Sequence, residues 1–165
     1  MEAELLEQLY KAHHGAAYAY CLALCGDHHL ASDIVADAFV KAYLSLPDNV
    51  PSFRYWLLRV CKNLYFDHLR RRKQETSDEP LEYVTDGVTP ESLYIQNETK
   101  RALWTEIAAL SPSDRELLPL HYFSGLPLQQ VAALVGLSYG AVRQRLSRLR
   151  RILRQEMEEQ GYDIS

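Results

Sequence analysis

The chain has 165 residues, 47% of them hydrophobic, which is enough apolar material for one core or for two small ones. No apolar run approaches the roughly 20 residues that a membrane-spanning helix needs, and the acidic start MEAELLEQLYK is unlike a secretory signal. We therefore expect a globular, cytoplasmic protein. The three cysteines, Cys21, Cys25 and Cys61, cannot all pair with one another, which fits reduced thiols.

The net charge of −4 argues against a nucleic-acid-binding protein only until the positions of the charges are considered. Residues 54–73 contain seven Lys and Arg against one acid, and residues 143–154 contain six Arg and no acid. Between them, residues 74–98 contain seven acids and no Lys or Arg. The pattern predicts two basic lobes on either side of an acidic connector.

Two amphipathic helices are expected first, over residues 3–24 with a stop near Gly26, and over residues 31–46. The second of these carries an additional stripe of two acids and two aliphatic residues: Asp33, Asp37, Val40 and Leu44. Such a mixed stripe indicates a surface that docks on another protein. The alternative, in which the aliphatic residues belong to the core and the acids are solvated, stays open at this point.

Pro47 and Pro51 end this helix, and the next helix is predicted over residues 53–73. Its expected buried arc is Phe53, Leu57, Val60, Cys61, Leu64 and His68. The opposite arc alternates cations with aromatic rings: Tyr55, Arg59, Lys62, Phe66, Arg70 and Lys73, with Asn63 at its margin. Cations suit phosphates and rings suit unstacked bases, so this arc predicts a nucleic-acid face, unless its rings belong to the core.

The acidic connector has two prolines, a glycine and no periodicity, which is typical of a linker. Thr89 and Pro90 then indicate the start of the second lobe, in which a helix begins at Ser111-Pro112 and is kinked or broken at Pro119. A short helix over residues 128–135, a turn at Gly136 and a long helix from Tyr139 to about residue 158 follow.

This last arrangement is typical of a helix-turn-helix, in which the N-terminal part of the second helix enters the major groove of DNA. Gly136 suits a turn that needs positive φ, and Val142, Leu146 and Leu149 pack the long helix back on its partner. Four polar residues then point outward toward base edges and phosphates: Arg143, Gln144, Ser147 and Arg148. A helical hairpin with a solvated basic face is the alternative.

Two blocks of the sequence resemble one known family. DIVADAFVKAY followed by FRYWLLRVCKNLYFDHLRRRK resembles the first domain of the extracytoplasmic-function sigma factors, and LSPSDRELLPLHYFSGLPLQQVAALVGLSYGAVRQRLSRLRR resembles their second domain. The resemblance implies an all-α protein of two small helical domains joined by a flexible acidic linker, the second a helix-turn-helix domain. We expect these parts at residues 1–73, 74–89 and 90–165.

By the same resemblance, the chain is a bacterial transcription initiation factor whose partners are core RNA polymerase and promoter DNA. The stripe of Asp33, Asp37, Val40 and Leu44 would meet the polymerase clamp. The melted minus-ten element would be held by Asn49, Tyr55, Arg59, Lys62, Asn63, Phe66 and Arg70. The minus-thirty-five duplex would be read by Arg143, Gln144, Ser147 and Arg148. The resemblance also admits an inhibitory anti-sigma factor, without identifying one.

Some positions depart from the family pattern. The loop before Phe53 reads PDNVPS where the family often has an FRG-type run, so Asn49 is assigned by position alone. Pro127 stands where relatives often have a capping Ser or Thr, and Pro119 interrupts a helix that the family usually leaves intact. These departures affect the fine geometry and the promoter sequence that is recognised.

Other functions are weaker readings of the sequence. There is no Gly-rich phosphate loop and no paired-carboxylate site, so no catalytic residue and no cofactor is expected. A zinc or thiol-sensing site has the candidates His13, His14, Cys21, Cys25, His28 and His29. Since small cysteines in a helix core need no metal, we expect no metal site.

Two binding functions compete with the sigma-factor reading. One is a stand-alone helix-turn-helix regulator, which would not need aromatic rings such as Tyr55 and Phe66 on its first lobe. The other is an interaction module whose basic faces bind an acidic protein. The charge pattern also suggests that the acidic connector competes with DNA for the two basic faces of the free protein.

Overall fold

A computed structural model describes residues 2–46, 52–76 and 97–162. Those residues form helices joined by short connections, and no strand occurs in them. The first lobe holds three helices: α1 (Ala3–Cys25), α2 (His28–Ser45) and α3 (Phe53–Thr76). The second lobe holds α4 (Glu98–Ala108), α5 (Pro112–Leu118), the π-helix η1 (Pro119–Phe123), α6 (Leu128–Val135) and α7 (Tyr139–Glu159). The prediction of an all-α chain is confirmed.

Local sequence signals explain where the helices of the first lobe begin and end. α1 ends at Gly26, whose φ of 70° is the left-handed conformation that glycine adopts without a steric penalty. Asp27 then caps α2, because its carboxylate accepts hydrogen bonds from the backbone N–H groups of His29 and Leu30. Ser52 caps α3 through the backbone N–H of Tyr55. The three helices pack on one another, with α1 beside both α2 and α3.

The helix-turn-helix of the second lobe has the predicted geometry. α6 and α7 have the expected starts, and Gly136 between them has a φ of 74°. Ser138 caps α7 by accepting a hydrogen bond from the backbone N–H of Ala141. The predicted break at Pro119 is confirmed as well, since α5 ends at Leu118 and the π-helix follows. No side chain caps α6, because Pro127 occupies that position.

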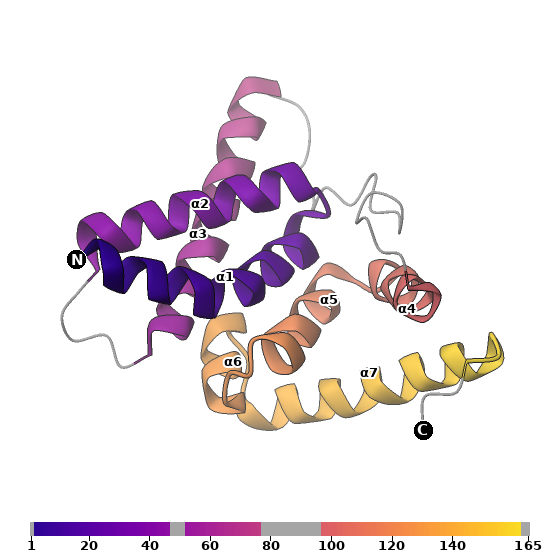
Figure 1. Cartoon of the computed structure of the whole chain (residues 1–165). Helices are drawn as coiled ribbons and strands as arrows, with labels where there is room; N and C mark the ends of the chain where they lie inside the picture. Colours follow the sequence, from indigo (N-terminus) through magenta and orange to yellow (C-terminus); the bar gives the residue numbers. More distant parts are fainter. Residues whose placement is uncertain (1, 47–51, 77–96, 163–165) are drawn as a thin grey trace.

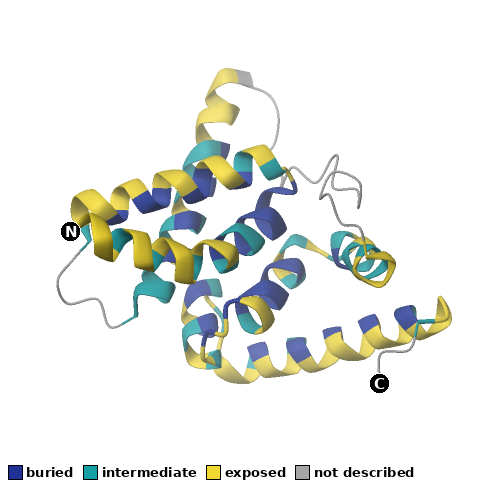
Figure 2. Ribbon diagram, viewed as in Figure 1, coloured by how far each residue is buried: buried dark blue, intermediate teal, exposed yellow. Residues whose placement is uncertain are grey.

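The two lobes lie against each other and share one core. In Figure 1, α5 and α6 lie directly below α1, and α7 runs along the outer side of the second lobe. α1 contacts both α5 and η1, and the buried apolar side chains of the two lobes form one continuous cluster. Figure 2 shows the buried positions on the inner sides of the helices and the exposed positions on their outer sides. The first lobe therefore covers part of the second.

The predicted buried arc of α3 is partly wrong. Leu57 and Cys61 are buried as expected, whereas Phe53, Val60, Leu64 and His68 are only half-buried. Leu58, Tyr65 and Leu69 are buried instead. These three residues lie toward the side of the helix that carries Lys62. The buried side is thus rotated toward Lys62, which the periodicity of a single helix cannot reveal.

Candidate nucleic-acid interfaces and docking surface

The mixed stripe on α2 lies on the surface. Val40 is 54% exposed and Leu44 is 73% exposed, and both acids, Asp33 and Asp37, are exposed too. The alternative that the two aliphatic residues belong to the core is therefore wrong. Two large aliphatic side chains that face solvent beside two carboxylates make a surface suited to a protein partner with both apolar and basic groups.

The predicted nucleic-acid face of α3 has an open part and a covered part. Arg59, Asn63 and Arg70 are exposed, as their assignment to DNA requires. Tyr55 and Phe66 are half-buried and pack against the core cluster. Their rings are therefore fixed by packing and keep part of their surface accessible. Asn49 lies outside the described residues.

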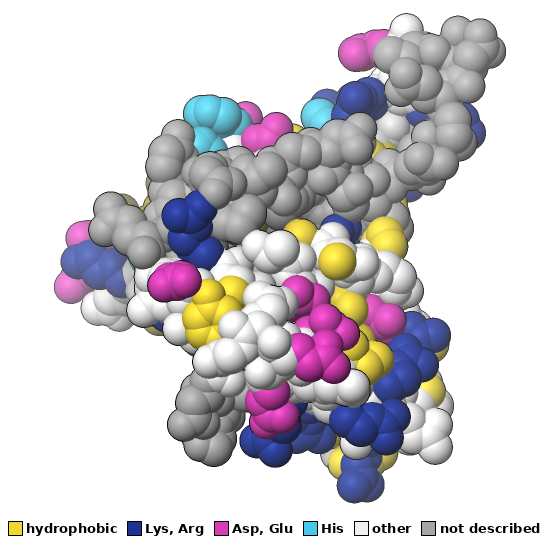
Figure 3. Space-filling view, turned by 90° about the vertical axis from the view of Figure 1, so that its right-hand side faces the viewer, with side chains coloured by type: hydrophobic (Ala, Val, Ile, Leu, Met, Phe, Trp, Pro, Cys, Tyr) yellow, Lys and Arg dark blue, Asp and Glu magenta, His cyan; other side chains and the backbone are white. Residues whose placement is uncertain are grey.

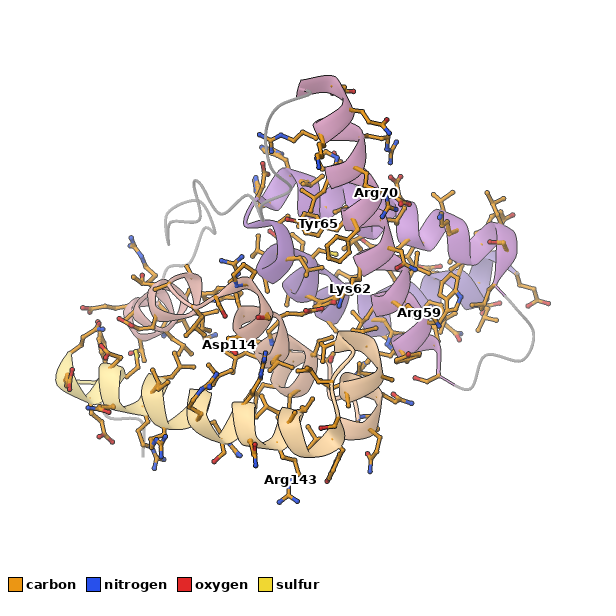
Figure 4. All side chains as sticks on the ribbon, turned by 180° about the vertical axis from the view of Figure 1, so that it is seen from behind. Arg59, Lys62, Tyr65, Arg70, Asp114 and Arg143 are labelled. Carbon is orange, nitrogen blue, oxygen red and sulfur yellow. The ribbon has the colours of Figure 1, made fainter. Side chains whose placement is uncertain are left out.

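Lys62 lies in the covered part, between α3 and the second lobe (Figure 4). Its ammonium is 2.8 Å from a carboxylate oxygen of Glu116 on α5 and donates to the carbonyl of Leu134 at 3.1 Å. The Lys62 side chain is 19% exposed and that of Glu116 is 5% exposed. Removing one partner of such a buried pair typically costs about 3–5 kcal/mol, because the other charge is left uncompensated. The ammonium of Lys62 is therefore held firmly by the carboxylate of Glu116.

Tyr20 of α1 binds the same carboxylate. Its hydroxyl donates to Glu116 at 2.5 Å, and its ring is fully buried. Burial is the main cause that raises the pKa of Tyr20 well above 10, and the charge of Glu116 adds to it. The hydroxyl consequently stays protonated and serves as a donor. One carboxylate oxygen from the second lobe thus receives two donors from the first.

Two further cations cross between the lobes, and each binds a carbonyl at the end of a helix. Arg54 of α3 donates to the carbonyl of Ser124, the residue that follows η1. Arg115 of α5, which is 2% exposed, donates to the carbonyl of Ala23 in the last turn of α1 at 2.7 Å. Carbonyls in the last turn of a helix lack partners inside the helix and carry partial negative charge, so cations satisfy them well.

The recognition helix α7 exposes all four predicted DNA-reading residues. Arg143, Gln144, Ser147 and Arg148 are exposed, and Figure 4 shows Arg143 projecting away from the first lobe. The guanidinium of Arg143 lies 5.7 Å from the ring centre of Tyr139, a cation–π distance. That of Arg148 lies 3.4 Å from the carboxylate of Asp114 on α5. All four side chains remain exposed to solvent while the lobes are in contact.

A groove of about 700 Å³ in the second lobe was not predicted from the sequence. It lies between α4, η1 and α7, and exposed Tyr122 and Phe123 line it on the η1 side. Arg150, Arg151 and Arg154 line it on the α7 side, and Figure 3 shows Lys and Arg side chains gathered beside hydrophobic ones at the lower edge of the molecule. An apolar groove with a cationic rim suits an amphipathic helix that carries acids. The signal in the sequence was the pair Tyr122-Phe123 at the end of an interrupted helix.

His13 and the three cysteines of the first lobe are part of its packing. His13 accepts a hydrogen bond from Arg54 at 3.0 Å, and burial followed by the charge of Arg54 lowers the pKa of His13. Cys21, Cys25 and Cys61 are buried, free thiols. A hydrogen bond with Cys61 raises the pKa of Cys21, and burial raises that of Cys25 to about 11, so both remain thiols. Across the part of the chain that the structure describes, no group of three His, Cys, Asp or Glu residues is placed to hold a metal ion.

Comparison with known proteins gives the family. Residues 9–75 match the family model of Sigma-70 region 2, and residues 100–153 match that of Sigma-70, region 4. The chain belongs to the sigma-70 family. Both regions occur in order in one chain, the first over α1–α3 and the second over α4–α7. The resemblance seen in the sequence is thereby confirmed.

Similar proteins place this sigma factor in the extracytoplasmic-function (ECF) group. It is 28% identical over 155 residues to the ECF RNA polymerase sigma factor SigW of Bacillus subtilis, covering 86% of this chain and 83% of that protein. It is 28% identical over 166 residues to SigL of Mycobacterium tuberculosis, covering 97% and 93%. The probable RNA polymerase sigma factor RfaY of Xanthomonas campestris is 36% identical over 147 residues, which cover 84% of this chain but only 37% of that protein.

Solved structures have the same fold. The sigma factor RpoE of Bartonella quintana, in complex with the anti-sigma factor NepR, matches with a TM-score of 0.71 at 22% identity and covers 92% of this sigma factor and 96% of that chain. CnrH in complex with the cytosolic domain of CnrY matches with a TM-score of 0.64 at 24% identity, covering 96% and 90%. No helix in residues 2–46, 52–76 and 97–162 is both long and apolar enough to cross a bilayer.

Proposed function

We propose that this sigma factor binds core RNA polymerase and directs it to a set of promoters, holding the melted minus-ten element with its first lobe and reading the minus-thirty-five duplex with its second. The observation that carries this proposal is the presence of both sigma-70 regions, in order, in one chain. A stand-alone helix-turn-helix regulator would need only the second of them.

The exposed stripe on α2 is proposed as the contact with the polymerase clamp. Val40 and Leu44 would supply apolar area, and Asp33 and Asp37 would pair with basic groups of the polymerase. The support is their exposure on one helix of the region 2 match. Burial of two aliphatic side chains of this size contributes on the order of 3 kcal/mol or more to association.

The face of α3 is proposed to hold the opened minus-ten strand, with Tyr55 and Phe66 against bases and with cations against phosphates. Half-burial supports this role, since a ring already fixed by packing loses little entropy when a base stacks on it. Arg59, Asn63 and Arg70 are exposed beside these rings. Lys62 and Asn49 complete the proposed set.

The N-terminal half of α7 is proposed to read the minus-thirty-five element in the major groove. Arg143 and Gln144 have side chains that make two hydrogen bonds to guanine and adenine respectively. Arg148 and Ser147 would contact phosphates or base edges. Their support is exposure on the second helix of a helix-turn-helix.

The activity proposed is binding without bond chemistry, and the compartment proposed is the cytoplasm, where core RNA polymerase works. Three buried free thiols suit that compartment. An anti-sigma factor is proposed as a further partner, with support from one fold neighbour whose structure contains the anti-sigma factor NepR.

In vitro transcription tests the proposal. Core RNA polymerase with this protein should produce transcripts from discrete genomic promoters that core alone does not use, and sequencing their 5′ ends would define the two promoter elements. Binding of this protein to specific duplex DNA in the absence of core, with no core-dependent transcripts, would favour the stand-alone regulator instead.

A further inference from the structure

The contact between the lobes uses residues from the helix that is proposed to hold DNA. Arg54, Leu58 and Lys62 follow one another at intervals of four residues, so they lie along one side of α3. Leu58 is buried in the shared core, and the two cations reach the second lobe on either side of it. Lys62 stands at the border between this side and the face of Arg59, Phe66 and Arg70.

Within residues 2–46, 52–76 and 97–162, the acceptors of these two cations belong to the second lobe, apart from His13, which accepts from Arg54. The ammonium of Lys62 pairs with the carboxylate of Glu116 and donates to the carbonyl of Leu134, which lies in the last turn of α6. The guanidinium of Arg54 donates to the carbonyl of Ser124. The second lobe is therefore in direct contact with Arg54 at the end of η1.

A carboxylate and a DNA phosphate are alternative partners for one ammonium group. Both are anions that form short charge-assisted hydrogen bonds, and Lys62 cannot be held by Glu116 and neutralise a phosphate in the same place. The carbonyl of Leu134, in the last turn of α6, occupies a second position beside the same ammonium. One edge of the proposed minus-ten face is thus unavailable as long as the lobes stay together.

We propose that Glu116 is an internal competitor of DNA, which holds Lys62 and keeps the free protein in a closed form that binds single-stranded DNA weakly. Tyr20 completes the competing site by donating to the same carboxylate oxygen. Opening the lobes frees Lys62 and uncovers the edge of the α3 face. The inference rests on the proposed function of α3 and adds how that face is regulated.

The test compares the full-length protein with Glu116→Gln. The matched control is Glu158→Gln, which removes the same charge from an exposed position on α7. The probe is a fluorescein-labelled single-stranded oligothymidine, read by anisotropy at one fixed low salt concentration. If the closed form is populated roughly nine times in ten, its release raises the apparent affinity by about tenfold. Glu158→Gln should change it far less.

Small-angle X-ray scattering measures the separation of the two lobes in the absence of DNA. The wild-type protein should have a radius of gyration near the value of about 15 Å expected for a compact chain of this length. Glu116→Gln should increase it while the helical circular dichroism stays unchanged. Equal gains in affinity for Glu116→Gln and Glu158→Gln, with no expansion, would mean that net charge alone acts and would overturn the proposal.

A second variant keeps the test decisive if Glu116→Gln does not fold. Arg54→Ala removes the other cation that ties α3 to the second lobe. The loss of a cation would by itself weaken binding to an anionic probe. A stronger affinity for oligothymidine therefore identifies opening, and a radius of gyration equal to that of the wild type, with no gain in affinity, contradicts it.

Failure of the Glu116 proposal can be distinguished from failure of the proposed function. If core polymerase with the wild-type protein yields no promoter-specific transcripts, the proposed function fails, although the anisotropy and scattering results still report on Glu116. If transcripts appear but neither variant opens or binds more tightly, the function stands and the competition by Glu116 is rejected.

Discussion

Arg148 on the recognition helix is held by Asp114 on α5, with its guanidinium 3.4 Å from both carboxylate oxygens. Arg143, five residues earlier on the same helix, lies 5.7 Å from the ring centre of Tyr139 instead, and among the described residues no carboxylate forms an ion pair with it. The two arginines should therefore differ in how freely they reach DNA.

Duplex recognition should depend more on Arg143 than on Arg148. Arg143→Ala should cost about 1–3 kcal/mol at one position of the minus-thirty-five element if it contacts a base in two places. Arg148→Ala should cost less, because its guanidinium must first leave Asp114. Transcription from a promoter library measures the effect of both substitutions. Arg154→Ala is the control, because it removes the same charge from the side of α7 that lines the groove of the second lobe. Equal effects of all three variants at every position would exclude base reading by Arg143.

Polymerase docking should depend on the exposed aliphatic residues of α2. Val40→Asp combined with Leu44→Asp should abolish co-purification with core polymerase, since two charges would enter an apolar contact. The helical circular dichroism should not change, because both side chains already face solvent. Ile152→Asp, at an exposed apolar position on α7, serves as the control. Normal co-purification of the double variant would remove α2 from the docking surface.

Strand opening should require the aromatic rings of α3. Since Tyr55 and Phe66 are half-buried, leucine keeps more of their packing than alanine does. Tyr55→Leu or Phe66→Leu should leave closed complexes intact but lower the permanganate reactivity of thymines near the start site, because each lost stack is worth about 1–3 kcal/mol. Tyr10→Leu, an exposed ring on α1, is the control. Full reactivity in both α3 variants would show that the rings do not hold bases.

Stability should fall in mild acid because of His13. Burial and the Arg54 charge lower its pKa below 6.5 in the folded state, so the unfolded chain takes up the proton more readily. The contribution of His13 is therefore complete above about pH 6.5 and is lost as the pH falls through the folded pKa. Urea unfolding across this range measures it. His13→Gln should flatten the slope; an unchanged slope in this variant would assign the acid sensitivity to other groups.

The sequence predicted the helices well because their signals are local. Gly26 and Gly136 each end a helix with positive φ, Pro119 ends α5, and the heptad-like spacing of Val142, Leu146 and Leu149 placed the inner side of α7. Such signals act within a few residues of the chain. They are read correctly without knowing what packs on each helix.

The contacts of Lys62 could not be predicted from the sequence, because they are not local. Its partners Glu116 and Leu134 belong to the other lobe, and nothing in the local spacing of α3 points to them. The rotation of the buried side toward Leu58 and Tyr65 has the same origin, since it depends on what α3 packs against. The groove beside Phe123 was missed because three separate helices form it.

The full burial of Arg115 between α1 and α5 also bears on how the protein melts. When the lobes part, Ala23 loses its donor and Tyr20 meets water, so neither lobe retains the contacts that it has in the intact chain. We expect each lobe to melt at a higher temperature in the closed form than in the open form. A destabilising change in either half then also weakens the contact that stabilises the other half.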